Sequence, residues 1–152
     1  MRYETNTWLL IGATLSALAA LLHVAVIVGG PDSYRFFGAG QDMARVAAAG
    51  SPVPALVTPA IATMLAIRAL YALSGAGHIG RLPLPGTALS AITAIYVLRG
   101  LALVPALAVP ALRKPFNVRS SAICLGFGLV HPVGLAQVWT RLGSTAASRG
   151  AR

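Results

Sequence analysis

The side chains in this sequence that could do chemistry are ionisable residues inside long apolar segments: His23, Arg68, Arg99 and His131. All three acidic residues lie outside these segments, so no carboxylate is available there to neutralise the two arginines. An uncompensated charge near the centre of a membrane-spanning helix costs roughly 2.5–3.5 kcal/mol. The arginines must therefore reach the membrane interface, contact carbonyl groups and tyrosines, or bind an anion.

Two tyrosines share helical faces with these arginines, in pairs spaced i,i+3: Arg68/Tyr71 and Tyr96/Arg99. At a rise of about 1.5 Å per residue, Arg68 and Tyr96 fall at similar depths. By the same arithmetic, Arg99 and His131 both fall near mid-membrane. A tyrosine can hold a guanidinium through cation–π contact. We therefore predict a polar ligand-binding pocket lined by Arg68, Tyr71, Tyr96, Arg99 and His131. The alternative is that Arg68 snorkels to the interface and that His131 bonds a helix carbonyl.

The sequence carries no recognisable catalytic, metal-binding or cofactor-binding motif. No carboxylate pair, Cys/His pair or Ser/His/Asp set falls at one depth, and the P-loop, dinucleotide and HExxH patterns do not occur. His23 and His131 have no third ligand for a metal ion. Cys124 is the only cysteine, and we interpret it as a small packing residue. We predict no metal, no cofactor and no catalytic residue.

Composition places the chain in a membrane. Hydrophobic residues make up 57% of the 152 residues, charged residues 10%, and the mean hydropathy is +0.76. A soluble domain carries roughly 25% charged residues, so these values exclude a soluble enzyme, a disordered tail and a DNA-binding domain. The net charge of +9 is therefore interpreted as that of a membrane protein. The cations lie between apolar segments, where their partners are membrane lipids and not nucleic acid.

Four apolar segments are long enough to cross a bilayer, which takes roughly 20 helical residues. They cover residues 7–28, 53–75, 85–109 and 120–140. They lack the alternation of barrel strands, so helices are expected. We predict an all-α membrane protein, one domain of four transmembrane helices in an up-down bundle, with a polar C-terminal tail at 141–152. Pro105 is expected to kink or end the third helix.

Small residues recur at a spacing of four on two of these helices. The stripes comprise Gly12, Ser16 and Ala20 on the first helix, and Ala122, Gly126 and Gly134 on the fourth. Small stripes let helix backbones approach closely in lipid. We interpret them as packing faces inside the bundle, with a homo-oligomer or a larger membrane complex as the alternative.

The connection over residues 29–52 has the most individual sequence. Gly-Gly-Pro at its start should end the first helix, and a second short helix is expected over 42–49. Its apolar residues are too few to cross a bilayer, so an interfacial segment fits best. We interpret the segment as a solvated cap, with a ligand lid as the alternative. The candidate lid residues are Tyr34, Arg35, Phe36 and Phe37.

The segment GGPDSYRFFGAGQDMARVAAAGSPVPALVT, with YALSGAGHIGRLPLP and IYVLRGL further on, resembles a group of small four-helix bacterial inner-membrane proteins of uncharacterised function. The resemblance covers about residues 20–103, and the GGPxxYRFFGAG pattern is its most specific part. The order of helix, loop, Gly-Ser-Pro-x-Pro and helix is also similar, more loosely, to DoxX-type membrane proteins. Both resemblances imply a four-helix architecture and no reactive motif.

Three functions remain open on the sequence. The first is a non-catalytic accessory or structural role, the second is binding or transport of an anionic amphiphile, quinone or lipid headgroup, and the third is a small membrane enzyme. Arg, Ala and Gly richness suggests a bacterial genome, and we expect a multi-pass inner-membrane protein. Basic residues are divided evenly between the two sides, but the C-terminal tail is a free basic end. We therefore expect both termini to be cytoplasmic.

Overall fold

The computed structural model describes residues 5–37 and 41–149, with side chains up to residue 140. Within these residues every regular element is helical. The elements in chain order are α1 (Thr7–Phe36), α2 (Gln41–Ala48), α3 (Val53–Gly75), α4 (Pro85–Leu101), α5 (Leu103–Ala108), the 3-10 helix η1 (Pro110–Leu112) and α6 (Pro115–Arg149). The segment interpreted as a polar tail therefore continues α6 as far as Arg149. Its side chains, and residues 150–152, lie outside the described part.

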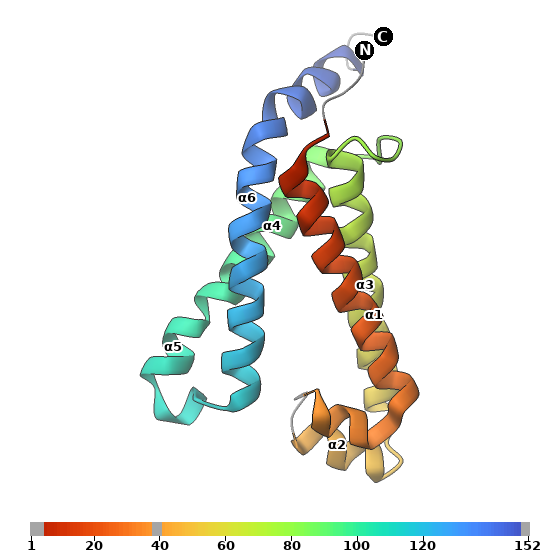
Figure 1. Ribbon diagram of the computed structural model, residues 1–152, viewed down its shortest axis with the longest axis vertical. Helices are drawn as coiled ribbons and strands as arrows, with labels where there is room; N and C mark the ends of the chain where they lie inside the picture. The colour runs from red at the N-terminus through yellow and green to blue at the C-terminus, as the bar shows by residue number, and fades with distance from the viewer. Residues whose placement is uncertain (1–4, 38–40, 150–152) are drawn as a thin grey trace.

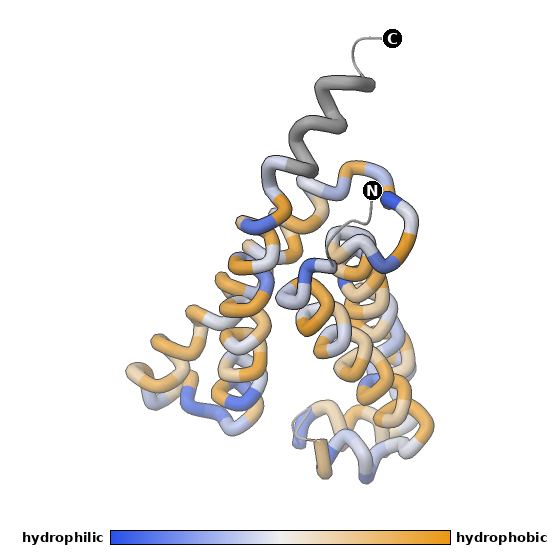
Figure 2. The backbone as a smooth tube through the Cα atoms, turned by 45° about the horizontal axis from the view of Figure 1, so that its top comes forward, coloured by the Kyte–Doolittle hydropathy of each residue, from blue (hydrophilic) through white to orange (hydrophobic). Residues whose placement is uncertain are grey.

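Four stretches of helix are long and apolar enough to cross a membrane: Thr7–Phe36, Val53–Gly75, Pro85–Ala108 and Pro115–Thr140. This confirms the predicted helical class and the number of long apolar helices within the described residues. Many of their large apolar side chains are exposed, among them Leu21, Leu98 and Leu129. In Figure 2 apolar stretches run along these helices, and polar stretches gather at several of the connections.

The long helices associate as two pairs, because α1 packs most extensively on α3 and α4 packs on α6. Figure 1 shows the pairs meeting near the two termini and diverging toward the opposite end. We call the first end the terminal end and the other the far end. The far end carries α2, α5, η1 and the start of α6 (Figure 1).

A polar contact at the terminal end ties three helices together. The Asn6 side-chain oxygen accepts a hydrogen bond from the Leu9 amide at 2.8 Å, which caps α1. The Asn6 amide group donates to the Gln137 side-chain oxygen on α6 at 2.9 Å. The Asn6 backbone N–H donates to the Ala76 carbonyl, directly after α3, at 3.2 Å. The start of α1 is therefore fixed to both helix pairs.

The break predicted at Gly-Gly-Pro is present, although helix resumes after it. Gly30 has φ 63° and ψ −155°, which breaks the helical path, and the helix continues through Pro31 to Phe36. A positive φ is readily adopted by glycine because it has no Cβ. The short helix expected over 42–49 is α2, Gln41–Ala48. Residues 38–40 lie outside the described part.

The third candidate span, Pro85–Ala108, contains an interruption, and the fourth helix begins earlier than predicted. The third is interrupted at Ala102, between α4 and α5, and Pro105 falls in the first turn of α5. That position suits proline, since a first-turn amide has no acceptor within its own helix. The fourth helix begins at Pro115 and not near residue 120, which is again a first-turn proline.

Candidate functional site

One polar cluster draws a side chain from each of the four long helices, with Tyr96 of α4 at its centre. The Tyr96 ring is 1% exposed. It lies 4.8 Å from the His131 ring and 5.1 Å from the Phe127 ring, both on α6. The Arg68 guanidinium of α3 lies over its face, with Cζ 4.8 Å from the ring centroid. The Tyr96 hydroxyl is 3.0 Å from the Ser16 hydroxyl of α1. We call these five residues the Tyr96 cluster.

His131 is fully buried where α6 crosses α1. Its Nδ1 is 3.0 Å from the Phe127 carbonyl, one turn earlier in the same helix. A carbonyl can only accept, so this contact requires the proton on Nδ1, and in the neutral ring Nε2 is then an acceptor. Nε2 is buried and has no hydrogen-bond partner among the residues that the structure describes. The ring packs on Gly12, where an added Cβ would lie 2.8 Å from Cε1. The absence of a side chain at Gly12 thus leaves room for the His131 ring.

Arg68 is half-buried, and its guanidinium makes a cation–π contact with the Tyr96 ring. Its guanidinium makes no hydrogen bond or ion pair with the described residues. Arg68 lies on α3 roughly 10 Å from the helix end at Gly75, at about 1.5 Å per residue. The guanidinium lies over the buried Tyr96 ring, so the structure favours the contact with tyrosine over snorkelling to the interface.

Arg99 lies apart from the Tyr96 cluster. Its two terminal nitrogens donate to hydroxyls of α6, Nη1 to Ser121 at 2.8 Å and Nη2 to Ser120 at 2.7 Å. Ser121 is 0% exposed. These serines precede His131 by about 15 Å along α6, at about 1.5 Å per residue. The charge of Arg99 is thus held by two hydroxyls, and the structure does not bring it to His131.

Tyr71 also points elsewhere. Its hydroxyl donates to the Pro83 carbonyl in the α3–α4 connection at 3.2 Å, while its ring packs against Tyr96 and its neighbours. Of the five candidate ligand-binding residues, the structure therefore gathers Arg68, Tyr96 and His131. Tyr71 contributes only its ring, and Arg99 forms a separate contact.

The candidate lid residues divide into one anchor and three exposed side chains. Tyr34 is 4% exposed, and its hydroxyl is 2.9 Å from the Thr58 hydroxyl of α3. Arg35 is ion-paired with Asp32 at 2.9 Å. Phe36 and Phe37 are exposed and stack edge to face with ring centroids 5.0 Å apart. The end of α1 is therefore fixed to α3, and the two phenylalanines project from it.

Serine hydroxyls are the functional groups that the sequence interpretation missed. On the sequence, Ser16 is interpreted only as part of a small-residue stripe, and residues 120–121 are assigned only to the start of the fourth span. A signal was present for Ser16, whose depth is similar to that of Tyr96 at about 1.5 Å per residue. Among the described residues no three His, Cys, Asp or Glu side chains come together as a metal site.

The arrangement is suited to holding helices together, because Tyr96 and Arg99 each direct their polar atoms to a hydroxyl on another helix. Comparison of the chain with protein-family models, with curated proteins and with solved structures gives no match.

Proposed function

We propose that the chain is a small non-catalytic protein of the bacterial inner membrane, with a structural or accessory role and with membrane lipids as its surroundings. Its four apolar helices would cross the bilayer as an up-down bundle. The exposed leucines along them support this, since such surface is compatible with lipid and unfavourable in water. Trp8 and Trp139 are also exposed, near the terminal end, where interfacial aromatics are expected.

One observation carries the structural role: the Ser16–Tyr96 contact joins α1 of one helix pair to α4 of the other. Both side chains are fully or almost fully buried, so water cannot replace the bond. In lipid, helices gain no hydrophobic driving force from packing together, and interhelical hydrogen bonds and close packing must supply the association. The Tyr96 cluster would then be the joint between the two pairs.

We propose that both termini are cytoplasmic. In the proposed four-span topology, the basic residues on the terminal side would be Arg2, Arg81, Arg141, Arg149 and Arg152, and those on the far side would be Arg35, Arg45, Arg113, Lys114 and Arg119. The numbers are equal, but Arg35 and Arg45 are ion-paired with Asp32 and Asp42. In addition, three of the terminal-side arginines, Arg141, Arg149 and Arg152, belong to a C-terminal segment without an acidic residue, which favours the cytoplasm for the terminal side.

A double-mutant cycle tests the joint. We expect Ser16→Ala and Tyr96→Phe each to lower the free energy of unfolding by about 0.5–1.5 kcal/mol. The coupling free energy between the two substitutions should be about 0.6–1.7 kcal/mol. This range runs from the average to the largest value measured for interhelical hydrogen bonds in a membrane protein. Unfolding of the purified protein in mixed micelles, followed by circular dichroism, gives all four values.

The matched control is Thr14→Ala, which removes a hydroxyl from the same helix. That hydroxyl is exposed and donates to the Leu10 carbonyl of its own helix, so its coupling to Tyr96→Phe should be near zero. Strictly additive effects of Ser16→Ala and Tyr96→Phe would show that the contact does not join the helices.

A further inference from the structure

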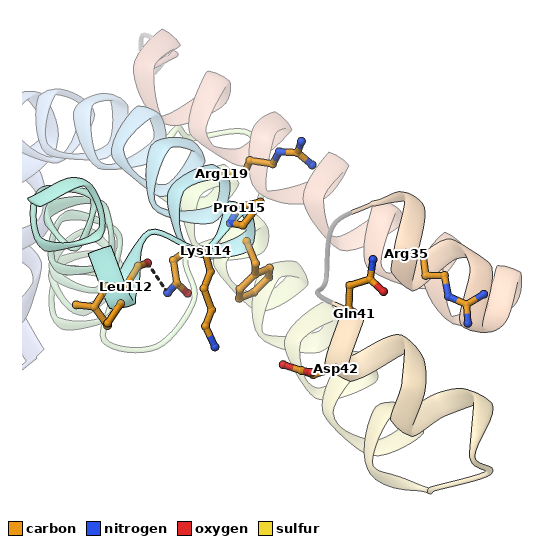
Figure 3. A pocket seen from close by; sticks show the side chains of 10 residues that line it. Arg35, Gln41, Asp42, Leu112, Lys114, Pro115 and Arg119 are labelled. Carbon is orange, nitrogen blue, oxygen red and sulfur yellow. Dashed lines mark hydrogen bonds between the residues drawn. The ribbon is translucent and has the colours of Figure 1, made fainter. Parts of the chain in front are cut away.

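A pocket of about 670 Å³ lies at the far end, between the two helix pairs. Its lining comes from two places distant in sequence, the end of α1 with the start of α2, and η1 with the first turns of α6. Figure 3 shows Lys114, Pro115 and Arg119 on one side and Gln41 and Asp42 on the other. The pocket thus lies where the two helix pairs diverge. Its α6 residues, in the first turns of that helix, are distant from the α6 residues of the Tyr96 cluster.

The pocket has an excess of positive charge. Its lining includes one carboxylate, Asp42, and three cations, Arg35, Lys114 and Arg119. Asp42 is ion-paired with Arg45, and Arg35 is ion-paired with Asp32. The Lys114 ammonium and the Arg119 guanidinium make no hydrogen bond or ion pair with the part of the chain that the structure describes. Two cations are therefore available to a ligand.

The pocket lining also includes apolar side chains. Leu112 and Phe116 line it, and each is 44% exposed. It lies at the far ends of two candidate spans, Thr7–Phe36 and Pro115–Thr140. If these helices cross a bilayer, the pocket falls at the level of lipid headgroups. A ligand that fits it has an anionic group beside an apolar portion.

We propose that this pocket binds the phosphate-bearing headgroup of an anionic membrane lipid. The planar guanidinium of Arg119 can donate two parallel hydrogen bonds to phosphate oxygens, and Lys114 adds a compact charge. Phe116 and Leu112 lie against the start of the acyl chains. A zwitterionic lipid carries a cation of its own, which these two side chains repel, so the pocket selects lipids with net negative charge.

The test uses the full chain in nanodiscs that contain phosphatidylglycerol or phosphatidylcholine, with lipid retention measured by native mass spectrometry. Wild type should retain phosphatidylglycerol selectively. The double variant Lys114→Gln/Arg119→Gln should weaken this retention about 30-fold, or roughly fivefold for each cation near an anionic surface. Millimolar inorganic phosphate should not displace the lipid, because it has no apolar portion.

The control is Arg81→Gln/Arg113→Gln, which removes the same net charge at exposed positions outside the pocket lining. Arg113 donates to the Leu107 carbonyl instead. Equal loss from both double variants, or equal retention of the two lipids, would overturn the proposal. So would loss with Arg68→Gln and not with Lys114→Gln/Arg119→Gln, which would place the lipid at the Tyr96 cluster. Displacement by inorganic phosphate would indicate a site for the free anion. The melting temperature of Lys114→Gln/Arg119→Gln should match wild type, since both side chains are exposed.

Discussion

Gly100→Ala should strongly destabilise the α4–α6 pair. A Cβ at Gly100 would lie 2.7 Å from the Leu125 Cα and 2.9 Å from its backbone nitrogen. These are backbone atoms of the facing helix, so no side-chain rotation can relieve the contact. Overpacking of this kind costs about 1–3 kcal/mol or more. We expect a clearly lower melting temperature in detergent, followed by circular dichroism.

Gly126→Ala is the matched control, because it adds the same methyl group to α6 at an exposed position. A Cβ there meets nothing within 4 Å. Alanine also favours a helix over glycine by about 1 kcal/mol, so the variant should be as stable as wild type or slightly more stable. Equal losses from the two substitutions would mean that α4 and α6 do not cross at Gly100.

Arg99→Leu has the second large expected effect. It removes two hydrogen bonds from a charged donor and leaves the buried Ser121 hydroxyl without this partner. Hydrogen bonds to charged groups contribute about 1.5–3 kcal/mol each. Removing the charge should lower the free energy of membrane insertion by roughly 2.5–3.5 kcal/mol. This change concerns insertion of the helix and does not stabilise the packing of the inserted helices. We therefore expect normal expression and a lower melting temperature.

Arg99→Lys separates geometry from charge. A lysine keeps the cation but has one ammonium in place of a planar fork, so it should reach one serine and restore stability only in part. Ser120→Ala/Ser121→Ala should lower stability to a similar extent as Arg99→Leu. A stable, well-expressed Arg99→Leu protein would show that Arg99 is a dispensable side chain that reaches the interface.

The spans could be predicted from sequence because length and apolar content alone determine them. Their ends could not, because they depend on local proline geometry. Pro115 starts α6 earlier than the apolar pattern does, and Gly30 bends α1 without ending it. Both segments are polar enough to look like loops, yet helix is present in each, in the second case after the break at Gly30.

Depth arithmetic placed Arg68 level with Tyr96, and the structure brings them into contact. The same arithmetic placed Arg99 level with His131, and there the structure separates them. A depth counted along the sequence ignores the tilt of each helix. In addition, α6 starts earlier than predicted, which shifts its residues along the helix axis relative to α4. Arg99 therefore contacts Ser120 and Ser121. The small stripe on α6 shows the same limit: Gly134 packs on Leu9, whereas Ala122 and Gly126 are exposed.

The central claim, a bundle that crosses the membrane four times, is tested most directly by cysteine labelling in intact cells. Cys124→Ala removes the native thiol, and single cysteines are placed by Ala49→Cys at the far end or by Gly80→Cys in the α3–α4 connection. Both positions are exposed. A membrane-impermeant maleimide should label Ala49→Cys in intact cells and Gly80→Cys only after permeabilisation. The opposite pattern would keep the four spans and reverse the orientation, whereas labelling of both cysteines from the same side would contradict the account.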